Sequence, residues 1–72
     1  MRAVLKTNDP ILLNFAQALL KDAGIEGVVF DTHMSIMDGS MGFMPRRLMV
    51  SDDEAAEAEK VLRNALPDYR PP

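Results

Sequence analysis

The stretch "NDPILLNFAQALLKDAG", residues 8–24, decides the fold because it contains one helix with a start signal and a stop signal. Asn8 or Asp9 can accept hydrogen bonds from the first free amides, and the fixed φ of Pro10 suits the first turn. Gly24 supplies the C-terminal stop. Between these signals the apolar residues recur at helical spacing, at Leu12, Phe15, Ala16, Leu19, Leu20 and Ala23. The spacing predicts an amphipathic helix over residues 10–23, whose apolar face needs a sheet to cover.

The segments on both sides of this helix have the composition of strands. "RAVLKT", residues 2–7, alternates polar and apolar side chains, and "IEGVVFDTHM", residues 25–34, is rich in β-branched residues. A third strand is predicted at "RRLMV", residues 46–50. The methionine-rich and glycine-rich stretch "HMSIMDGSMGFMPRR", residues 33–47, contains the connection between the second and third strands. A turn is predicted there at Asp38 and Gly39.

A second helix follows the third strand. "SDDE", residues 51–54, has the spacing of a capping box, in which Ser51 accepts from a backbone amide and Glu54 reaches back. Its apolar stripe consists of Ala55, Ala58, Val61, Leu62 and Ala65.

The predicted order of elements is therefore βαββα. Two helices with one apolar face each, connected in this way, cover the same face of a three-stranded antiparallel sheet. This is the α+β, ferredoxin-like arrangement, and we expect one such domain over residues 1–66. The full motif has a fourth strand, which is missing or vestigial here because residues 67–72 form a proline-rich tail. That tail is expected to be loose, and the first strand is then an open edge unless the tail or another chain covers it.

Composition excludes several classes of function. The 72 residues include no cysteine, so disulfides and thiolate zinc sites are excluded. A net charge of -3 argues against nucleic acid as the main partner. The first ten residues have no apolar signal segment and no run is long enough to span a membrane, so we expect a cytoplasmic protein without a membrane partner. A chain this short has a small core, which favours a homo-oligomer.

The chain also resembles a known family. The residues that carry the resemblance are "DP…AQALLKDAGIEGVVFD…G…MPRRLMVSDDEAAEAEKVL", with Gly24, Pro45, Val50 and the Asp52-Asp53 cap as its main landmarks. They are similar to a small bacterial domain often labelled "putative signal transducing protein". The resemblance implies a ferredoxin-like fold similar to that of the P-II nitrogen-regulatory proteins, which bind nucleotide and 2-oxoglutarate. It assigns no catalytic residue.

The sheet face opposite the helices is the first candidate site. Because successive side chains of a strand point to opposite faces, one set of side chains is expected to face the helices, namely Ala3, Leu5, Val28, Phe30, Leu48 and Val50. The opposite face then has an apolar centre with a charged rim, formed by Arg2, Val4, Lys6, Val29, Asp31, His33, Arg47 and Met49. Such a composition is typical of a contact surface, for a second copy or for another protein.

Two alternatives remain beside this interaction module. In the first, a P-II-like sensor binds a small anionic metabolite near residues 36–47, with Gly39, Gly42, Arg46 and Arg47 as candidate contacts. In the second, His33 acts as a base oriented by Asp31.

A metal site is a third alternative. His33 could join the nearby methionines, which are Met34, Met37, Met41 and Met44, in binding Cu(I). Packing or contact is the preferred role of the methionines. The sequence-based prediction is a non-catalytic regulatory or interaction module with no cofactor and no metal.

Overall fold

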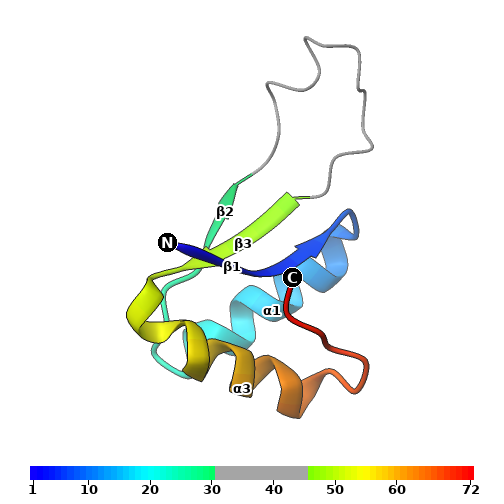
Figure 1. Ribbon diagram of the computed structural model, residues 1–72. Helices are drawn as coiled ribbons and strands as arrows, with labels where there is room; N and C mark the ends of the chain where they lie inside the picture. Colours follow the sequence, from blue (N-terminus) through cyan, green and yellow to red (C-terminus); the bar gives the residue numbers. More distant parts are fainter. Residues whose placement is uncertain (31–45) are drawn as a thin grey trace, which may run out of the picture.

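The computed structural model describes residues 1–30 and 46–72, and it confirms the predicted order of elements. The elements are β1 (Arg2–Thr7), α1 (Pro10–Asp22), β2 (Val28–Phe30), β3 (Arg46–Val50), the 3-10 turn η1 (Asp52–Glu54) and α3 (Ala55–Ala65). Both helices lie on the same side of the antiparallel sheet (Figure 1). The fold is therefore the predicted α+β, ferredoxin-like βαββα arrangement.

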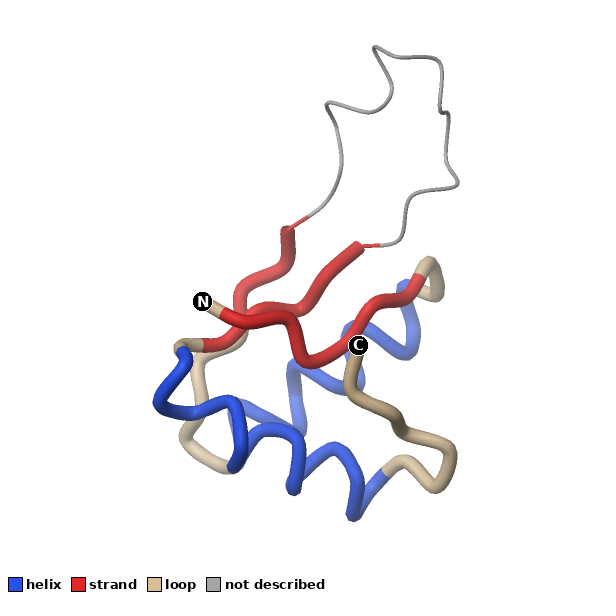
Figure 2. Tube along the Cα trace, in the orientation of Figure 1, coloured by secondary structure: helices blue, strands red, loops and turns tan. Residues whose placement is uncertain are grey.

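The sheet has the strand order β1-β3-β2, so β3 lies in the centre and is antiparallel to both neighbours (Figure 2). This order follows from a right-handed β-α-β crossover that leaves a gap between β1 and β2, into which β3 then pairs. β1 is consequently an edge strand, at the side where the full motif would place its fourth strand.

The apolar core lies between the sheet and the two helices. Its buried members are Val4, Leu5, Leu13, Ala16, Leu20, Ile25, Leu48, Val50, Ala55, Ala58 and Leu62. The predicted stripe of α1 was wrong at two positions, because Phe15 is 48% exposed and Ala23 is exposed as well. Apolar residues surround much of this helix, so spacing alone did not fix which face points inward. Neither helix in the described part of the chain has the length and hydropathy needed to cross a membrane.

Both ends of α1 have the predicted signals. The Asp9 carboxylate accepts from the amides of Ile11 (2.9 Å) and Leu12 (3.4 Å), which makes Asp9 the N-cap. At the other end Gly24 has a φ of 79°, and the amide of Ile25 donates to the Leu20 carbonyl at 2.8 Å. This is a Schellman motif, in which a glycine without a Cβ adopts the left-handed conformation at no steric cost.

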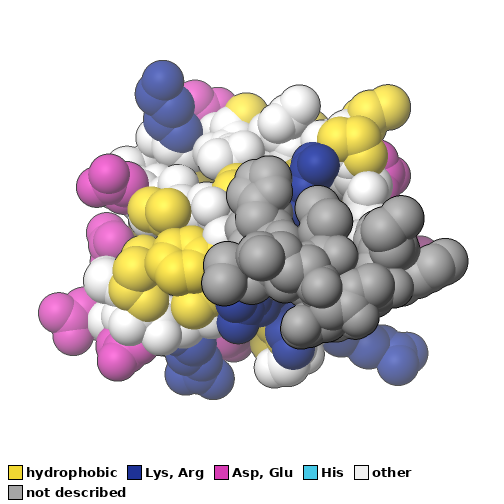
Figure 3. Space-filling view, turned by 90° about the horizontal axis from the view of Figure 1, so that it is seen from above, with side chains coloured by type: hydrophobic (Ala, Val, Ile, Leu, Met, Phe, Trp, Pro, Cys, Tyr) yellow, Lys and Arg dark blue, Asp and Glu magenta, His cyan; other side chains and the backbone are white. Residues whose placement is uncertain are grey.

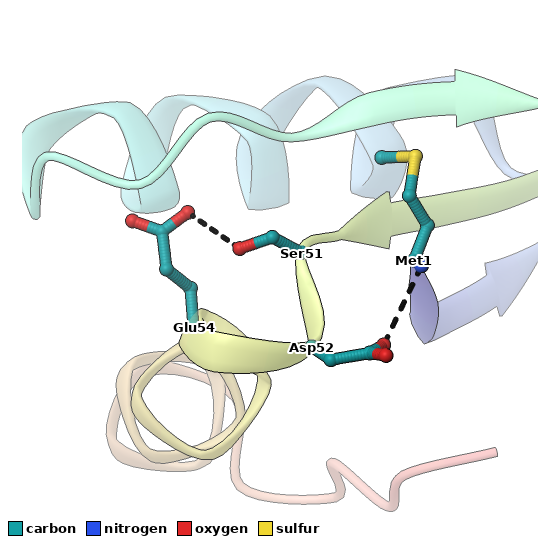
Figure 4. A network of polar contacts seen from close by, with 4 residues as sticks. All are labelled: Met1, Ser51, Asp52 and Glu54. Carbon is teal, nitrogen blue, oxygen red and sulfur yellow. Dashed lines mark hydrogen bonds and ion pairs between the residues drawn. The ribbon is translucent and has the colours of Figure 1, made fainter.

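The start of α3 differs from the prediction. Residues 52–54 form a 3-10 turn, and Ser51 makes no side-chain hydrogen bond to a backbone amide. Its hydroxyl instead donates to the Glu54 carboxylate at 3.2 Å, while Asp52 lies 3.4 Å from the amino group of Met1 (Figure 4). The predicted capping box is therefore replaced by a contact between two side chains, because the tighter 3-10 turn makes its own backbone bond from the Glu54 amide to the Ser51 carbonyl.

The C-terminal segment is docked rather than loose. After α3 the chain turns back and ends beside β1 (Figure 1). Leu66 and Tyr69 pack against the core, and the Tyr69 hydroxyl donates to the carbonyl of Val4. One tyrosine thus covers part of the β1 edge.

Candidate functional site

The open face of the sheet carries two rows of side chains that run across all three strands. Residues paired across antiparallel strands share a face, and residues two apart on one strand do so as well. The register places Ala3 beside Met49 and Met49 beside Val28, which gives an apolar row. The second row lies two residues along β3 and consists of Lys6, Arg47 and Phe30. We call these six residues the open face.

The open face exposes large apolar side chains. Phe30 is 41% exposed and Val28 is 39% exposed, whereas Met49 and Ala3 are half-buried. Figure 3 views the molecule from above and shows a group of hydrophobic side chains with charged side chains around it. An aromatic and a branched aliphatic side chain at this exposure are typical of a contact surface.

Positive charge is concentrated at one end of the open face. Lys6 and Arg47 are directly paired across β1 and β3, and Arg46 is paired with Thr7 in the adjacent position. Like charges placed opposite each other destabilise a strand pair. Within residues 1–30 and 46–72 the ion pairs are those of Met1 with Asp52 and of Arg2 with Glu59, so neither Lys6 nor Arg47 is neutralised by a described residue. This end of the sheet is therefore suited to an anion or an acidic side chain.

Three residues predicted for this face lie on the helix side instead. Val4 is fully buried in the core, Val29 packs against the core, and the Arg2 guanidinium lies 3.7 Å from the Glu59 carboxylate of α3. Lys6, Arg47 and Met49 are on the open face as predicted.

These corrections have two physical causes. The register of β1 shifts between Ala3 and Leu5, so Val4 is the extra residue of a β-bulge, which shifts the alternation of the residues before it. The other cause lies in β2, where Val29 is the residue that faces the helices, because it pairs with the buried Leu48. Val28 and Phe30, predicted to face the helices, are therefore on the open face. Phe30 is the candidate site residue that the sequence-based prediction missed. Its face could have been predicted from Leu48, the apolar residue at the centre of β3, because the residue paired with Leu48 must face the helices and its neighbours must not.

The remaining predicted site residues lie outside the described residues. They are Asp31, His33, Gly39 and Gly42, together with the methionines Met34, Met37, Met41 and Met44. The catalytic and copper alternatives therefore stay untested. In the part of the chain that the structure describes, no cluster of three metal-binding side chains occurs. What the described site can do is bind, through an apolar row and a cationic row.

Comparison with known families identifies the chain. Residues 1–66 match the family described as "putative prokaryotic signal transducing protein". The chain belongs to this family. The match spans every helix and strand of the fold, and it confirms the family label that the sequence motifs indicated. A search of curated proteins found no match. The docked residues 67–70 lie outside the matched residues.

Proposed function

We propose that this family member is a small non-catalytic interaction module of the cytoplasm, which associates with a second copy through the open face. The observation that carries the proposal is the exposure of apolar side chains on the open face. Both helices cover the opposite face, so no described residues form a layer over Val28, Phe30 and Met49. A domain of this size has little core to offset its chain entropy, so covering an apolar sheet face stabilises it.

Light scattering after size exclusion at micromolar concentration tests this proposal. We expect the wild-type protein to have twice the chain mass of 8.0 kDa. Val28→Glu and Phe30→Glu each place a carboxylate in the interface, where desolvation disfavours it, so both variants are expected to be monomers. Glu57→Lys, on the exposed side of α3, is the matched control and leaves the dimer intact. A wild-type mass of 8.0 kDa would refute self-association.

A second candidate function is sensing of a small anionic metabolite. It is supported by Lys6 and Arg47, which are paired on the open face, and by Arg46, the neighbouring residue at the start of β3. Ligands that bind only the folded state raise the melting temperature. In a screen of nucleotides and 2-oxo acids, a saturable rise that Arg47→Ala abolishes would favour sensing over self-association alone. Equal shifts for the wild type and for Arg47→Ala would remove the sheet end from consideration.

A further inference from the structure

A groove lies at the β1 edge of the sheet. It has a volume of about 410 Å³ and is formed by three parts of the chain that are distant in sequence. β1 contributes Leu5 and Lys6, the first turn of α1 contributes Leu12, and the C-terminal segment contributes residues 66–70. A volume of about 300 to 1,000 Å³ is usual for small-molecule sites.

The floor of the groove is apolar. Leu5 is 7% exposed, while Leu12, Leu66 and Tyr69 are half-buried and pack against the core. The Tyr69 hydroxyl holds the C-terminal segment in place by donating to the Val4 carbonyl. The segment therefore forms one wall of the groove, and its position is fixed by a hydrogen bond as well as by packing.

The rim of the groove is mainly cationic. Lys6 from β1 and Arg70 from the C-terminal segment are exposed and line it, and Asp68 is the one acidic residue of the lining. The lining thus has a net positive charge in a chain whose net charge is -3. This local excess favours a ligand that carries one negative charge.

We propose that the groove binds a small amphipathic carboxylate, with an aliphatic chain against Leu5, Leu12 and Leu66 and its carboxylate toward Lys6 and Arg70. The site requires the C-terminal segment, of which residues 67–70 lie beyond the residues that match the family. Of the six open-face residues only Lys6 lines the groove, so the two sites share one residue and are otherwise distinct.

Titration with octanoate tests the site directly. Tyr69 is the only tyrosine and the chain has no tryptophan, so tyrosine fluorescence reports on the wall of the groove itself. We expect a saturable change in this fluorescence and a calorimetric stoichiometry of one octanoate per chain. Butanoate, which buries less chain, is expected to bind at least about tenfold more weakly. Octan-1-ol, which lacks the charge, is also expected to bind more weakly than octanoate.

Matched variants locate the bound carboxylate. Lys6→Gln and Arg70→Gln are each expected to weaken octanoate binding about threefold, the usual effect of one exposed charge. Lys60→Gln, on the exposed surface of α3, leaves it unchanged, and Arg47→Gln, beside Lys6 but outside the groove lining, weakens it less than Lys6→Gln does. Absence of saturable binding would overturn the proposal, and so would equal affinity in all four variants. Loss of binding in Arg47→Gln but not in Arg70→Gln would place the anion at the end of the sheet instead. Dimer formation by the wild type is measured separately and decides only the proposed self-association.

Discussion

Val4 and Tyr69 show how single residues complete this small fold. The bulge leaves Val4 without a partner on β3, and the Tyr69 hydroxyl donates to its carbonyl. A buried carbonyl left without a donor costs about 1 to 3 kcal/mol, so the contact contributes to stability as well as to shape. The contact also explains how a tail with three prolines docks at β1. Proline has no backbone N–H to donate to a neighbouring strand, so the Tyr69 side chain supplies the hydrogen bond instead.

Titration of Tyr69 is expected to weaken the fold in alkali. Burial, and then the negative charge of Glu59, raise the pKa of Tyr69 above the ordinary value of 10.0. Below pH 10.0 both the folded and the unfolded chain hold this proton, whereas above it the unfolded chain loses the proton first. The contribution of Tyr69 is therefore complete below pH 10.0 and is lost as the pH rises through the raised pKa of the folded state. Ionisation also removes the proton that the hydroxyl donates to Val4.

Tyr69→Phe provides the comparison for this prediction. The variant lacks the hydrogen bond and is expected to lose about 1 kcal/mol of unfolding free energy at neutral pH. It also lacks the tyrosine-dependent part of the alkaline loss of stability. Urea denaturation over a pH series measures the difference, and absorbance of tyrosinate follows Tyr69 alone. A Tyr69 pKa at or below 10.0 in the folded wild type would contradict the expected shift.

At the scale of elements, local sequence signals predicted which helices and strands exist and in what order. Pairing between distant strands determined which residues of β1 and β2 face the helices. The ends of α1 follow from Asp9, Pro10 and Gly24, which act through neighbouring amides and carbonyls. The strand β2 has three apolar residues in a row, so it has no alternation from which its phase can be read. The bulge in β1 depends on how β3 pairs with it, and no residue of "RAVLKT" marks it.

The candidate site was predictable to the same extent. Arg47 and Met49 were placed correctly because β3 alternates regularly between buried and partly exposed residues. Phe30 and Val28 were missed because they belong to the strand without alternation. The groove at the β1 edge could not be predicted, since it exists only when Leu5, Leu12 and Leu66 are brought together by the tertiary fold.

For the whole molecule, the assignment of residues to the helix side or to the open face of the sheet can be tested by changing valine to alanine at three positions. Val4 and Val29 lie on the helix side of the sheet, whereas Val28 lies on the open face. Val4→Ala is expected to cost about 2 kcal/mol, because Val4 is fully buried and its removal leaves a cavity. Val29→Ala is expected to cost about 1 kcal/mol, and Val28→Ala below about 0.5 kcal/mol in the monomer.

Protein concentration then separates folding from assembly. If two copies cover each other's open face, the difference in unfolding free energy between the wild type and Val28→Ala grows as the protein concentration is raised. Mass action stabilises the wild-type dimer more than it stabilises the weaker dimer of the variant. Val29→Ala differs from the wild type by the same amount at every concentration, since its side chain packs inside one chain. Urea denaturation at two protein concentrations measures both effects. A larger cost for Val28→Ala than for Val29→Ala at low concentration would contradict the assigned faces, whereas a cost of Val28→Ala that does not depend on concentration would leave the faces intact and refute the dimer.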